Sequence, residues 1–333
     1  MTEAPFVTAE QVAAAREAIS PSLRMTPVNQ SQSLSGIAGG PVHLKLEHTQ
    51  ITGSFKLRGA TNAVARLTDE QKARGVVGVS TGNHGRGLAY AASAAGVRCV
   101  ICMSSLVPQT KIDGIRSHGA EVRIIGRSQD EAQEEVDRLV KEEGMTMIPP
   151  FDHPDIIAGQ GTLALEILDE VPDVATLLVP VSGGGLISGV AAVIKARKPD
   201  AKVIGISMER GAAMYECQKS GKPVLVKELP TLADSLGGGI GLDNRLTFAM
   251  TRDLVDDLVL VSEAEIAAAI RHIYWQERQI VEGSGSVGVA ALLTGKIKSS
   301  GPVVAILSGG NIDMSQHYRI VSGEDVDVTK EAD

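Results

Sequence analysis

Three apolar runs that are typical of buried strands each lead into a turn rich in glycine and small polar residues. The turns read Ser80-Thr81-Gly82-Asn83-His84-Gly85, Ser182-Gly183-Gly184-Gly185-Leu186 and Ser308-Gly309-Gly310-Asn311. Glycine permits the backbone angles and the close approach by which amide groups surround a phosphate. The middle turn also leads into a predicted helix, whose N-terminus favours an anion. Three such turns in one chain favour ligand binding over merely tight turns.

A fourth segment supplies a candidate nucleophile. Lys56 stands in Gly53-Ser54-Phe55-Lys56-Leu57, directly after an apolar run over 42–46. A lysine amine that is partly buried has a lowered pKa and becomes a nucleophile near neutral pH. Most lysines are solvated surface charges, so this interpretation of Lys56 depends on its occurrence beside the three turns.

The elements that must position these residues follow from the pattern of apolar runs and helix starts. Continuous apolar runs suit strands that are buried on both faces of parallel sheets, and they occupy 76–79, 97–102, 122–125, 177–181, 203–206 and 303–307. Capping-box spacing predicts helix starts at Thr8, Thr68, Ser128 and Ser262, and Gly144 is placed to end one helix. Strands that alternate with helices predict an α/β fold with doubly wound, open parallel sheets. Ligands of such sheets bind beyond the carboxyl ends of the strands, where the glycine-rich turns lie.

Composition excludes several classes of function. The chain has 333 residues, of which 43% are hydrophobic and 22% charged, and a net charge of −8, which argues against a nucleic-acid partner. No stretch resembles a secretory leader or a membrane span, and three cysteines do not make a disulfide framework, so we expect a cytoplasmic protein without a membrane partner. Cys99 and Cys102 form a CxxC pattern, but they fall in a predicted buried strand and are expected to be core residues.

The four segments together resemble the fold-type II pyridoxal-phosphate (PLP) enzymes of the threonine dehydratase and serine racemase family. The resemblance runs from Pro27 to Asn311 and includes Ser54-Phe55-Lys56-Leu57-Arg58-Gly59-Ala60, Gly82-Asn83-His84-Gly85 and Ala158-Gly159-Gln160-Gly161-Thr162. It is closest to a subgroup of hydroxyectoine-utilisation and β-hydroxyaspartate dehydratases. It implies an ammonia-lyase that eliminates the β-hydroxyl of an amino-acid substrate, namely 3-hydroxyaspartate, threonine or serine.

The resemblance also implies roles for single residues. Lys56 would form the Schiff base with PLP and move the Cα proton, Asn83 would hydrogen-bond the phenolic oxygen, and Ser308 would lie beside the pyridine nitrogen. The phosphate would be bound by the backbone amides of Ser182, Gly183, Gly184, Gly185 and Leu186. The substrate carboxylate would be bound by Ser80, Thr81, Gly82 and His84. Glu282 falls where relatives place a residue near the cofactor ring, and Asp234 and the glycines at 237–239 are expected to form a loop that faces the cleft.

Three departures from the family pattern affect the expected activity. Thr81 replaces the serine that acts as the second acid/base of serine racemase, so racemisation is expected as a side activity. The positions that match a divalent-cation site in relatives are occupied by Ser207, Gly211 and Ala213, which makes a metal doubtful even with Glu209 and Glu216 nearby. Arg86 follows Gly85 where relatives often have a neutral residue, and its guanidinium suits a second substrate carboxylate. On that ground 3-hydroxyaspartate is a candidate substrate, unless Arg86 points to solvent.

Two other readings remain open from the sequence alone. Gly183, Gly185 and Gly189 follow a strand, and Glu209 lies near the end of the next, as in a nucleotide-binding oxidoreductase, although the third glycine is misplaced for that motif. A non-catalytic small-molecule binding protein would share the cleft without a need for Lys56.

The resemblance further implies how the domains are arranged. A large PLP-binding domain is expected over 1–74 and 146–333, and a small mobile domain over 75–145, with the cofactor in the cleft between them. Relatives are commonly homodimers, which implies the same state here. No regulatory domain is recognised after Asn311, so a catabolic enzyme is expected rather than a biosynthetic one.

Overall fold

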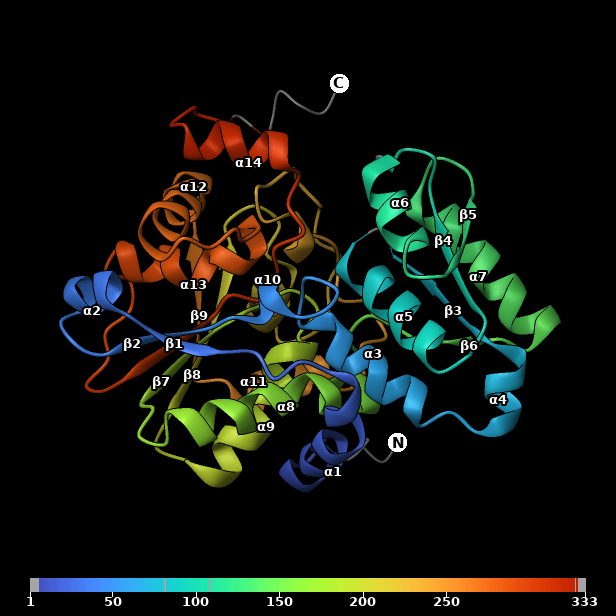
Figure 1. Cartoon of the computed structure of the whole chain (residues 1–333), viewed down its shortest axis with the longest axis horizontal. Helices are drawn as coiled ribbons and strands as arrows, with labels where there is room; N and C mark the ends of the chain where they lie inside the picture. The colour runs from blue at the N-terminus through green and yellow to red at the C-terminus, as the bar shows by residue number, and fades with distance from the viewer. Residues whose placement is uncertain (1–5, 81, 108, 327, 329–333) are drawn as a thin grey trace.

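The computed structural model describes residues 6–80, 82–107, 109–326 and 328, and within them the chain forms two open sheets. The larger sheet has six strands in the order β1 (Val28–Ser31), β2 (Val42–Lys45), β10 (Val303–Ile306), β7 (Thr176–Pro180), β8 (Lys202–Met208) and β9 (Asp257–Val261). The smaller sheet has four strands in the order β5 (Glu121–Ile124), β4 (Cys99–Met103), β3 (Val76–Val79) and β6 (Thr146–Met147). All neighbouring strands are parallel except the pair β1 and β2. The two sheets lie side by side in Figure 1.

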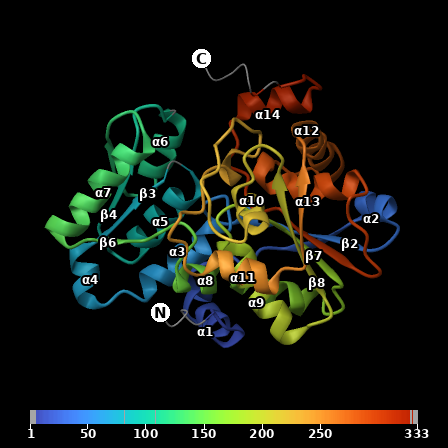
Figure 2. The same ribbon diagram turned by 180° about the vertical axis from the view of Figure 1, so that it is seen from behind.

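Helices cover both faces of the larger sheet because its central strands are apolar on both sides. Along β7, Leu177 and Val179 pack into one core cluster, and Leu178 packs into the other. The first face is covered by α1 (Ala9–Ile19), α8 (Pro154–Glu170), α9 (Gly185–Arg197) and α11 (Thr247–Leu254). The second face is covered by α2 (Gln32–Ala38), α12 (Glu263–His272), α13 (Gly283–Leu293) and α14 (Met314–Val321). Figure 2 shows α10 (Ala213–Ser220) and α11 from behind.

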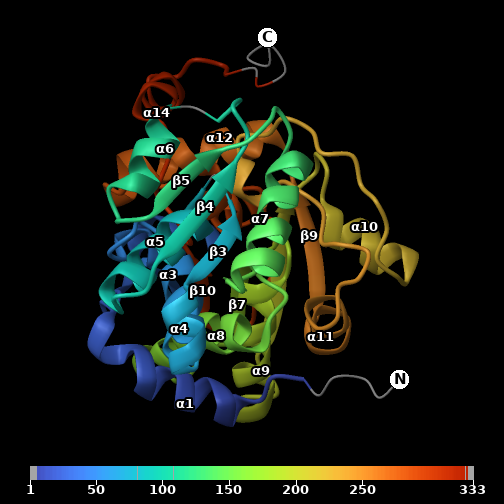
Figure 3. The ribbon, with the colours of Figure 1, turned by 90° about the vertical axis from the view of Figure 1, so that its right-hand side faces the viewer.

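The smaller sheet is also covered on both faces. One face packs against α3 (Lys56–Ala65), α5 (Asn83–Ala94) and α6 (Gln109–Arg116), and the other packs against α7 (Gln129–Glu143), as Figure 3 shows from the side. Helix α4 (Asp69–Arg74) leads into β3. Cys99 and Cys102 are buried, free thiols that belong to different core clusters on opposite faces of β4, which confirms that they are core residues.

The predicted fold class is confirmed, and so are its local signals. Each of the six predicted strands is present, and the bounds of all but β3 differ from the predicted ones by one or two residues. All four predicted capping boxes form, and Gly144 ends α7 in the left-handed conformation. No helix in the described residues is long and apolar enough to cross a membrane. The division into a large and a small mobile domain stays a prediction, although β6 places residues 146–147 in the smaller sheet.

Candidate active site

A cavity of about 360 Å³ lies where the carboxyl ends of β3, β7 and β10 meet. It is lined from both sheets, so the residues that the sequence predicts to act together do meet here. From the larger sheet and α3 come Lys56, Ser182, Gly183, Gly184, Gly185, Leu186 and Ser308. From the smaller sheet and α5 come Ser80, Gly82, Asn83 and His84. Thr81 lies outside the described residues.

Lys56 is the first residue of α3 and lines the cavity. Its Nζ donates a hydrogen bond to the backbone oxygen of Pro150 at 2.8 Å. Burial lowers the pKa of this amine to about 8, because the charged form loses hydration. A substantial fraction of Lys56 is therefore a neutral amine near physiological pH, as a nucleophile or a base requires.

The turn from β7 into α9 forms a cradle of backbone N–H groups. Gly184 is the N-cap of α9 and has a φ of +87°, a backbone conformation that residues with a side chain rarely adopt. A Cβ at Gly183 would lie 2.2 Å from the Phe151 ring. No backbone carbonyl in the described part of the chain accepts from the N–H groups of Gly184, Gly185 and Leu186. These donors and the positive end of the α9 dipole suit this turn to binding an anion.

A chain of polar side chains crosses from the smaller sheet to the larger one. The Asn83 amide nitrogen donates to Glu282 Oε1 at 2.7 Å, and its oxygen accepts from the Asn311 side chain at 2.7 Å. Glu282 Oε2 accepts from the Asn311 backbone N–H at 3.1 Å. Burial, and next the charge of Asp234, raise the pKa of Glu282 to about 7. Both Asn83 and Glu282 line the cavity, so these hydrogen-bonded side chains hold a titratable carboxyl group at the cavity wall.

The turn from β3 into α5 presents free donors to the cavity. Ser80 Oγ accepts from the backbone N–H of Gly85 at 3.0 Å, which fixes the turn. The N–H groups of Asn83 and His84 open α5 and have no backbone acceptor in the residues described. The His84 ring differs from these backbone groups, because its Nε2 already donates a hydrogen bond to the Ile148 oxygen at 2.9 Å. Burial, followed by the charge of Lys56, lowers the His84 pKa to about 4, so the ring is neutral and an anion would be bound by the backbone alone.

Arg86 is not among the residues that line the cavity. Its guanidinium packs against Gly114 of α6, where a Cβ would lie 2.3 Å from Nη2. The side chain is partly buried, and desolvation lowers its pKa, opposed by the charge of Glu282. The structure therefore places the Arg86 side chain between α5 and α6, and not in the cavity itself.

The structure adds residues that the sequence did not indicate. Lys111 of α6 lines the cavity and forms an ion pair with Asp234 at 3.0 Å, which joins the two sides of the cleft. Ser284 lines it too, with a buried hydroxyl that has no hydrogen-bond partner among the described residues. No local motif marks these two residues, whereas the expected cleft position of Asp234, Gly237 and Gly238 is confirmed. Among the residues described, no three His, Cys, Asp or Glu side chains are grouped as a metal site.

The packing around Gly189 bears on the alternative of a nucleotide-binding motif. A Cβ at this position would lie 2.3 Å from the Ile157 oxygen and 2.6 Å from the Gly161 nitrogen. Gly189 is therefore needed for the close crossing of α8 and α9. This packing explains the glycine without a bound dinucleotide.

Comparison with known proteins identifies the family. A model of the family described as "Pyridoxal-phosphate dependent enzyme" matches residues 19–309. A putative threonine dehydratase from Sinorhizobium fredii is 57% identical over 97% of this chain and 98% of its own length. An L-threonine ammonia-lyase from Thermotoga maritima is 42% identical over 95% of this chain and 79% of its own length. The structure of maize serine racemase superposes with a TM-score of 0.90 at 32% identity, over 95% of this chain and 97% of the racemase. The chain belongs to the pyridoxal-phosphate-dependent enzymes, and it is a lyase that uses this cofactor.

Proposed function

We propose that this enzyme is a dehydratase that converts a neutral β-hydroxy amino acid, L-threonine or L-serine, into an oxo acid and ammonia. The observation that carries the proposal is the Lys56 amine, with its pKa lowered to about 8, in the same cavity as the N–H cradle at Gly183–Leu186. The names of the curated relatives support the same class of reaction.

The residues of the cavity fit pyridoxal phosphate. The cradle suits a phosphate because a Cβ at Gly183 or Gly185 would meet Phe151, and the N–H groups of Gly184, Gly185 and Leu186 are unpaired with any described carbonyl. The cofactor, when bound, supplies the electron sink that lets the Cα proton of an amino acid leave. Lys56 would hold its aldehyde carbon, and Asn83 and Ser308 would face its ring.

Roles for the other residues follow from their chemistry. Lys56, once released by the substrate amine, would take the Cα proton, since its pKa suits general-base work near neutral pH. The backbone N–H groups of Asn83 and His84, with Ser80 and Gly82 beside them, would bind the substrate carboxylate. Ser308 is neutral and cannot hold a proton on the pyridine nitrogen as an aspartate would. Loss of a β-leaving group is thereby favoured over transamination.

The charges at the cavity favour a neutral substrate side chain over a second carboxylate. Three carboxylates line it, from Glu228, Asp234 and Glu282, against two amines, from Lys56 and Lys111. Lys111 is already paired with Asp234, and Arg86 does not line the cavity. A 3-hydroxyaspartate would therefore bring its extra charge next to acidic groups, and we rank it behind threonine and serine.

Ammonia release tests this ranking. The holoenzyme is offered L-threonine, L-serine and each stereoisomer of 3-hydroxyaspartate separately, and kcat/KM is measured for each. Faster turnover of threonine or serine supports the proposal, and Arg86→Gln should then leave the order unchanged. A higher kcat/KM for a 3-hydroxyaspartate, lost in Arg86→Gln, would overturn the ranking and restore Arg86 as a substrate-binding residue.

Racemisation is a second candidate activity, favoured by the likeness to maize serine racemase. It requires an acid/base on the face opposite Lys56, for which Thr81 is the candidate from the sequence. A threonine hydroxyl is more restricted in its rotamers than a serine hydroxyl, so we expect elimination to dominate. Chiral analysis of serine recovered from a partial reaction measures the ratio, and D-serine in excess of pyruvate would contradict this expectation.

We further infer that residues 75–145 move as a small domain and that the enzyme is a homodimer. The Lys111–Asp234 ion pair spans the cleft and would break as the cleft opens. Small-angle scattering with and without a substrate analogue tests closure, and sedimentation of the holoenzyme tests the dimer. An unchanged scattering profile or a monomer would contradict the respective inference.

A further inference from the structure

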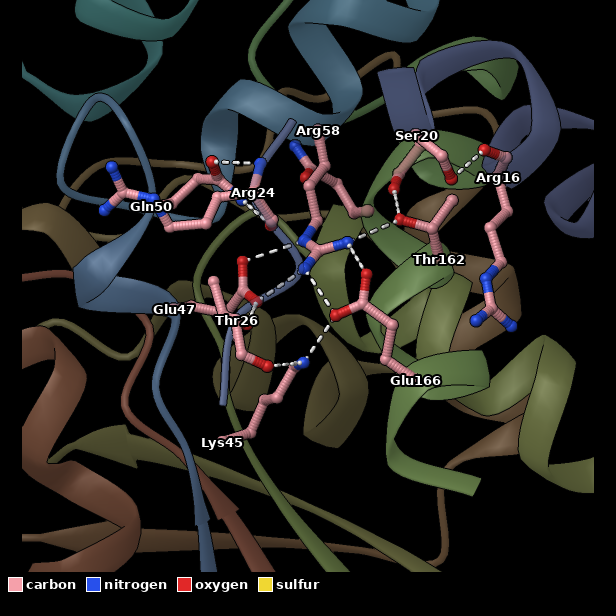
Figure 4. Close-up of polar contacts among 12 residues, drawn as sticks. Arg16, Ser20, Arg24, Thr26, Lys45, Glu47, Gln50, Arg58, Thr162 and Glu166 are labelled. Carbon is pink, nitrogen blue, oxygen red and sulfur yellow. Dashed lines mark hydrogen bonds and ion pairs between the residues drawn. The ribbon is translucent and has the colours of Figure 1, made fainter. Parts of the chain in front are cut away.

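Four buried charges surround one point beneath the cavity, and the mechanism above uses none of them. Two are positive, Lys45 and Arg58, and two are negative, Glu47 and Glu166. Lys45 and Glu47 are fully shielded from solvent, and Arg58 and Glu166 are 2% and 8% exposed. Figure 4 shows the four side chains, called the charge quartet below, pointing toward one another from β2, the short helix Glu47–Thr49, α3 and α8.

Arg58 is the centre of the quartet and uses all of its donors. Its Nε and Nη2 donate to the two oxygens of Glu47, each at 2.8 Å, and Nη1 and Nη2 donate to the two oxygens of Glu166, each at 2.8 Å. Nη1 also donates to Thr162 Oγ1 at 3.1 Å. A guanidinium has five N–H groups, so none is left without an acceptor. Lys45 Nζ completes the quartet with bonds to Glu166 and to the Thr26 oxygen.

Stability alone does not explain this arrangement. Removal of four charges from water costs several kcal/mol per ion, and apolar side chains of similar volume often stabilise a core equally well. The planar guanidinium does supply fixed geometry, because two bidentate pairs and one hydroxyl hold it in a single orientation. Although burial opposes ionisation of Glu47, the Arg58 guanidinium holds the pKa of that carboxyl below its usual value, so Glu47 stays ionised.

The quartet acts on the part of α3 that carries Lys56. Helix α3 begins without a side-chain cap, since its N-cap is Phe55, and Arg58 lies in its first turn two residues after Lys56. The Phe55 N–H is held by the Ser308 oxygen at 3.0 Å, and the quartet holds the other side of the same turn. Helix α8 supplies Glu166, and the segment just before it supplies Pro150, which accepts from Lys56.

Close packing prevents the turn from shifting in another way. A Cβ at Gly159 of α8 would lie 2.6 Å from the Gly59 Cα, so the two helices cross at contact distance beside the quartet. The Gly59 N–H donates to Gln160 at 3.2 Å. Motion of α3 along α8 would therefore have to break the Arg58 bonds and this contact together.

We propose that the charge quartet is a positioning device that fixes the first turn of α3 and thereby the place from which Lys56 reaches the cofactor. The proposal rests on Lys56 as the cofactor-binding lysine. Arg58 and its partners act through the backbone of α3, so they are positioning residues and touch neither substrate nor cofactor. A displacement of Lys56 by a fraction of an ångström would reduce proton transfer more than substrate binding.

The test compares Arg58→Lys with a control of similar stability loss. Lysine keeps the charge but cannot make two bidentate pairs, so the turn loses its fixed orientation. The control is Leu139→Ala, a fully buried residue of α7 in the core on the far side of the smaller sheet. Three quantities are measured on the holoenzymes: Tm, the circular dichroism of the cofactor band, and kcat and KM separately.

We expect both variants to lose Tm, but only Arg58→Lys to change the cofactor dichroism and to lose kcat by about tenfold to a hundredfold with KM within about threefold. Thr162→Val removes one of the five hydrogen bonds that Arg58 donates, so it should shift the cofactor dichroism in the same direction but by less. This variant replaces Arg58→Lys in the test if Arg58→Lys does not fold. Wild-type dichroism and kcat in a folded Arg58→Lys, or in Thr162→Val when that variant stands in, would overturn the proposal. Loss of cofactor attachment in Lys56→Ala tests the proposed function separately, so the two failures are distinguishable.

Discussion

The Asn83 amide nitrogen lies 2.7 Å from Glu282 Oε1, and this bond joins the first turn of α5 to the start of α13 across the cleft. Glu282 is 4% exposed, and burial raises its pKa to about 7. A carboxyl group beside the predicted cofactor ligand thus titrates in the physiological range, where a lone glutamate would be fully ionised.

Glu282→Gln should change how stability depends on pH. The folded pKa of about 7 is above the usual 4.5, so the stabilisation of the protonated form is complete below about pH 4.5 and is lost as the pH rises through about 7. Glutamine cannot ionise, and its oxygen can still accept from Asn83. The Tm of Glu282→Gln should therefore rise relative to that of the wild type between about pH 5 and about pH 8. A difference that does not depend on pH would contradict the assignment.

Asp234→Asn should shift the same titration. The charge of Asp234 raises the pKa of Glu282, second only to burial, so its removal lowers that pKa toward the usual value. The pH at which Glu282→Gln gains its advantage should be lower in the Asp234→Asn background. The lost ion pair with Lys111 is partly exposed and should cost at most about 1 kcal/mol. An unchanged midpoint would show that Asp234 does not act on Glu282.

Gly183→Ala should weaken cofactor binding. Its Cβ would lie 2.2 Å from the Phe151 ring, so the ring or the N–H cradle must move. Loss of about 1.4 kcal/mol or more of binding energy corresponds to a tenfold or greater rise in Kd, measured by titration of the apoprotein with pyridoxal phosphate. Gly40→Ala is the control, since no atom lies within 4 Å of its Cβ. Equal Kd values for both variants would contradict the role of the cradle.

The reactivity of Lys56 should follow its lowered pKa. Only the neutral amine attacks the aldehyde of pyridoxal phosphate, and burial lowers the pKa of Lys56 to about 8 from 10.5. The rate of covalent attachment to the apoprotein should rise with pH and level off above about pH 8, as followed by absorbance after rapid mixing. A rate that still rises steeply above about pH 9 would show that the amine is ordinary.

Much of the fold could be predicted because its signals are local. Capping boxes at Thr8 and Ser128 need only a residue and its neighbour three positions on, and the central strands are continuous apolar runs. Strands β1, β2, β6 and β9 were not among the six predicted strands, although the sequence shows an apolar run over 42–46 at β2, and β6 has only two residues. β1 reads Val-Asn-Gln-Ser at the antiparallel edge of the sheet and lacks the apolar run of a buried strand. β9, at the opposite edge, is only half buried although its residues 258–261 are all apolar.

The site was predictable where a motif carries it and not where tertiary packing decides. The cradle after β7 is recognised from its own glycines, and Lys56 from its occurrence together with the three glycine-rich turns. Arg86 does not line the cavity, because its side chain lies against Gly114, and its contact with substrate stays a prediction. The quartet had no local signal, because Glu166 is 108 residues from Arg58 in the chain and meets it only through the crossing of α3 and α8.

The proposal that Lys56 binds the cofactor and carries the reaction is tested by ammonia release from L-threonine in the presence of pyridoxal phosphate. Lys56→Ala is compared with the wild type. Lys141→Ala, an exposed lysine on α7, is the matched control. We expect turnover by the wild type and the control, and loss of both covalent cofactor attachment and ammonia release in a folded Lys56→Ala. Wild-type turnover in Lys56→Ala would contradict the proposal.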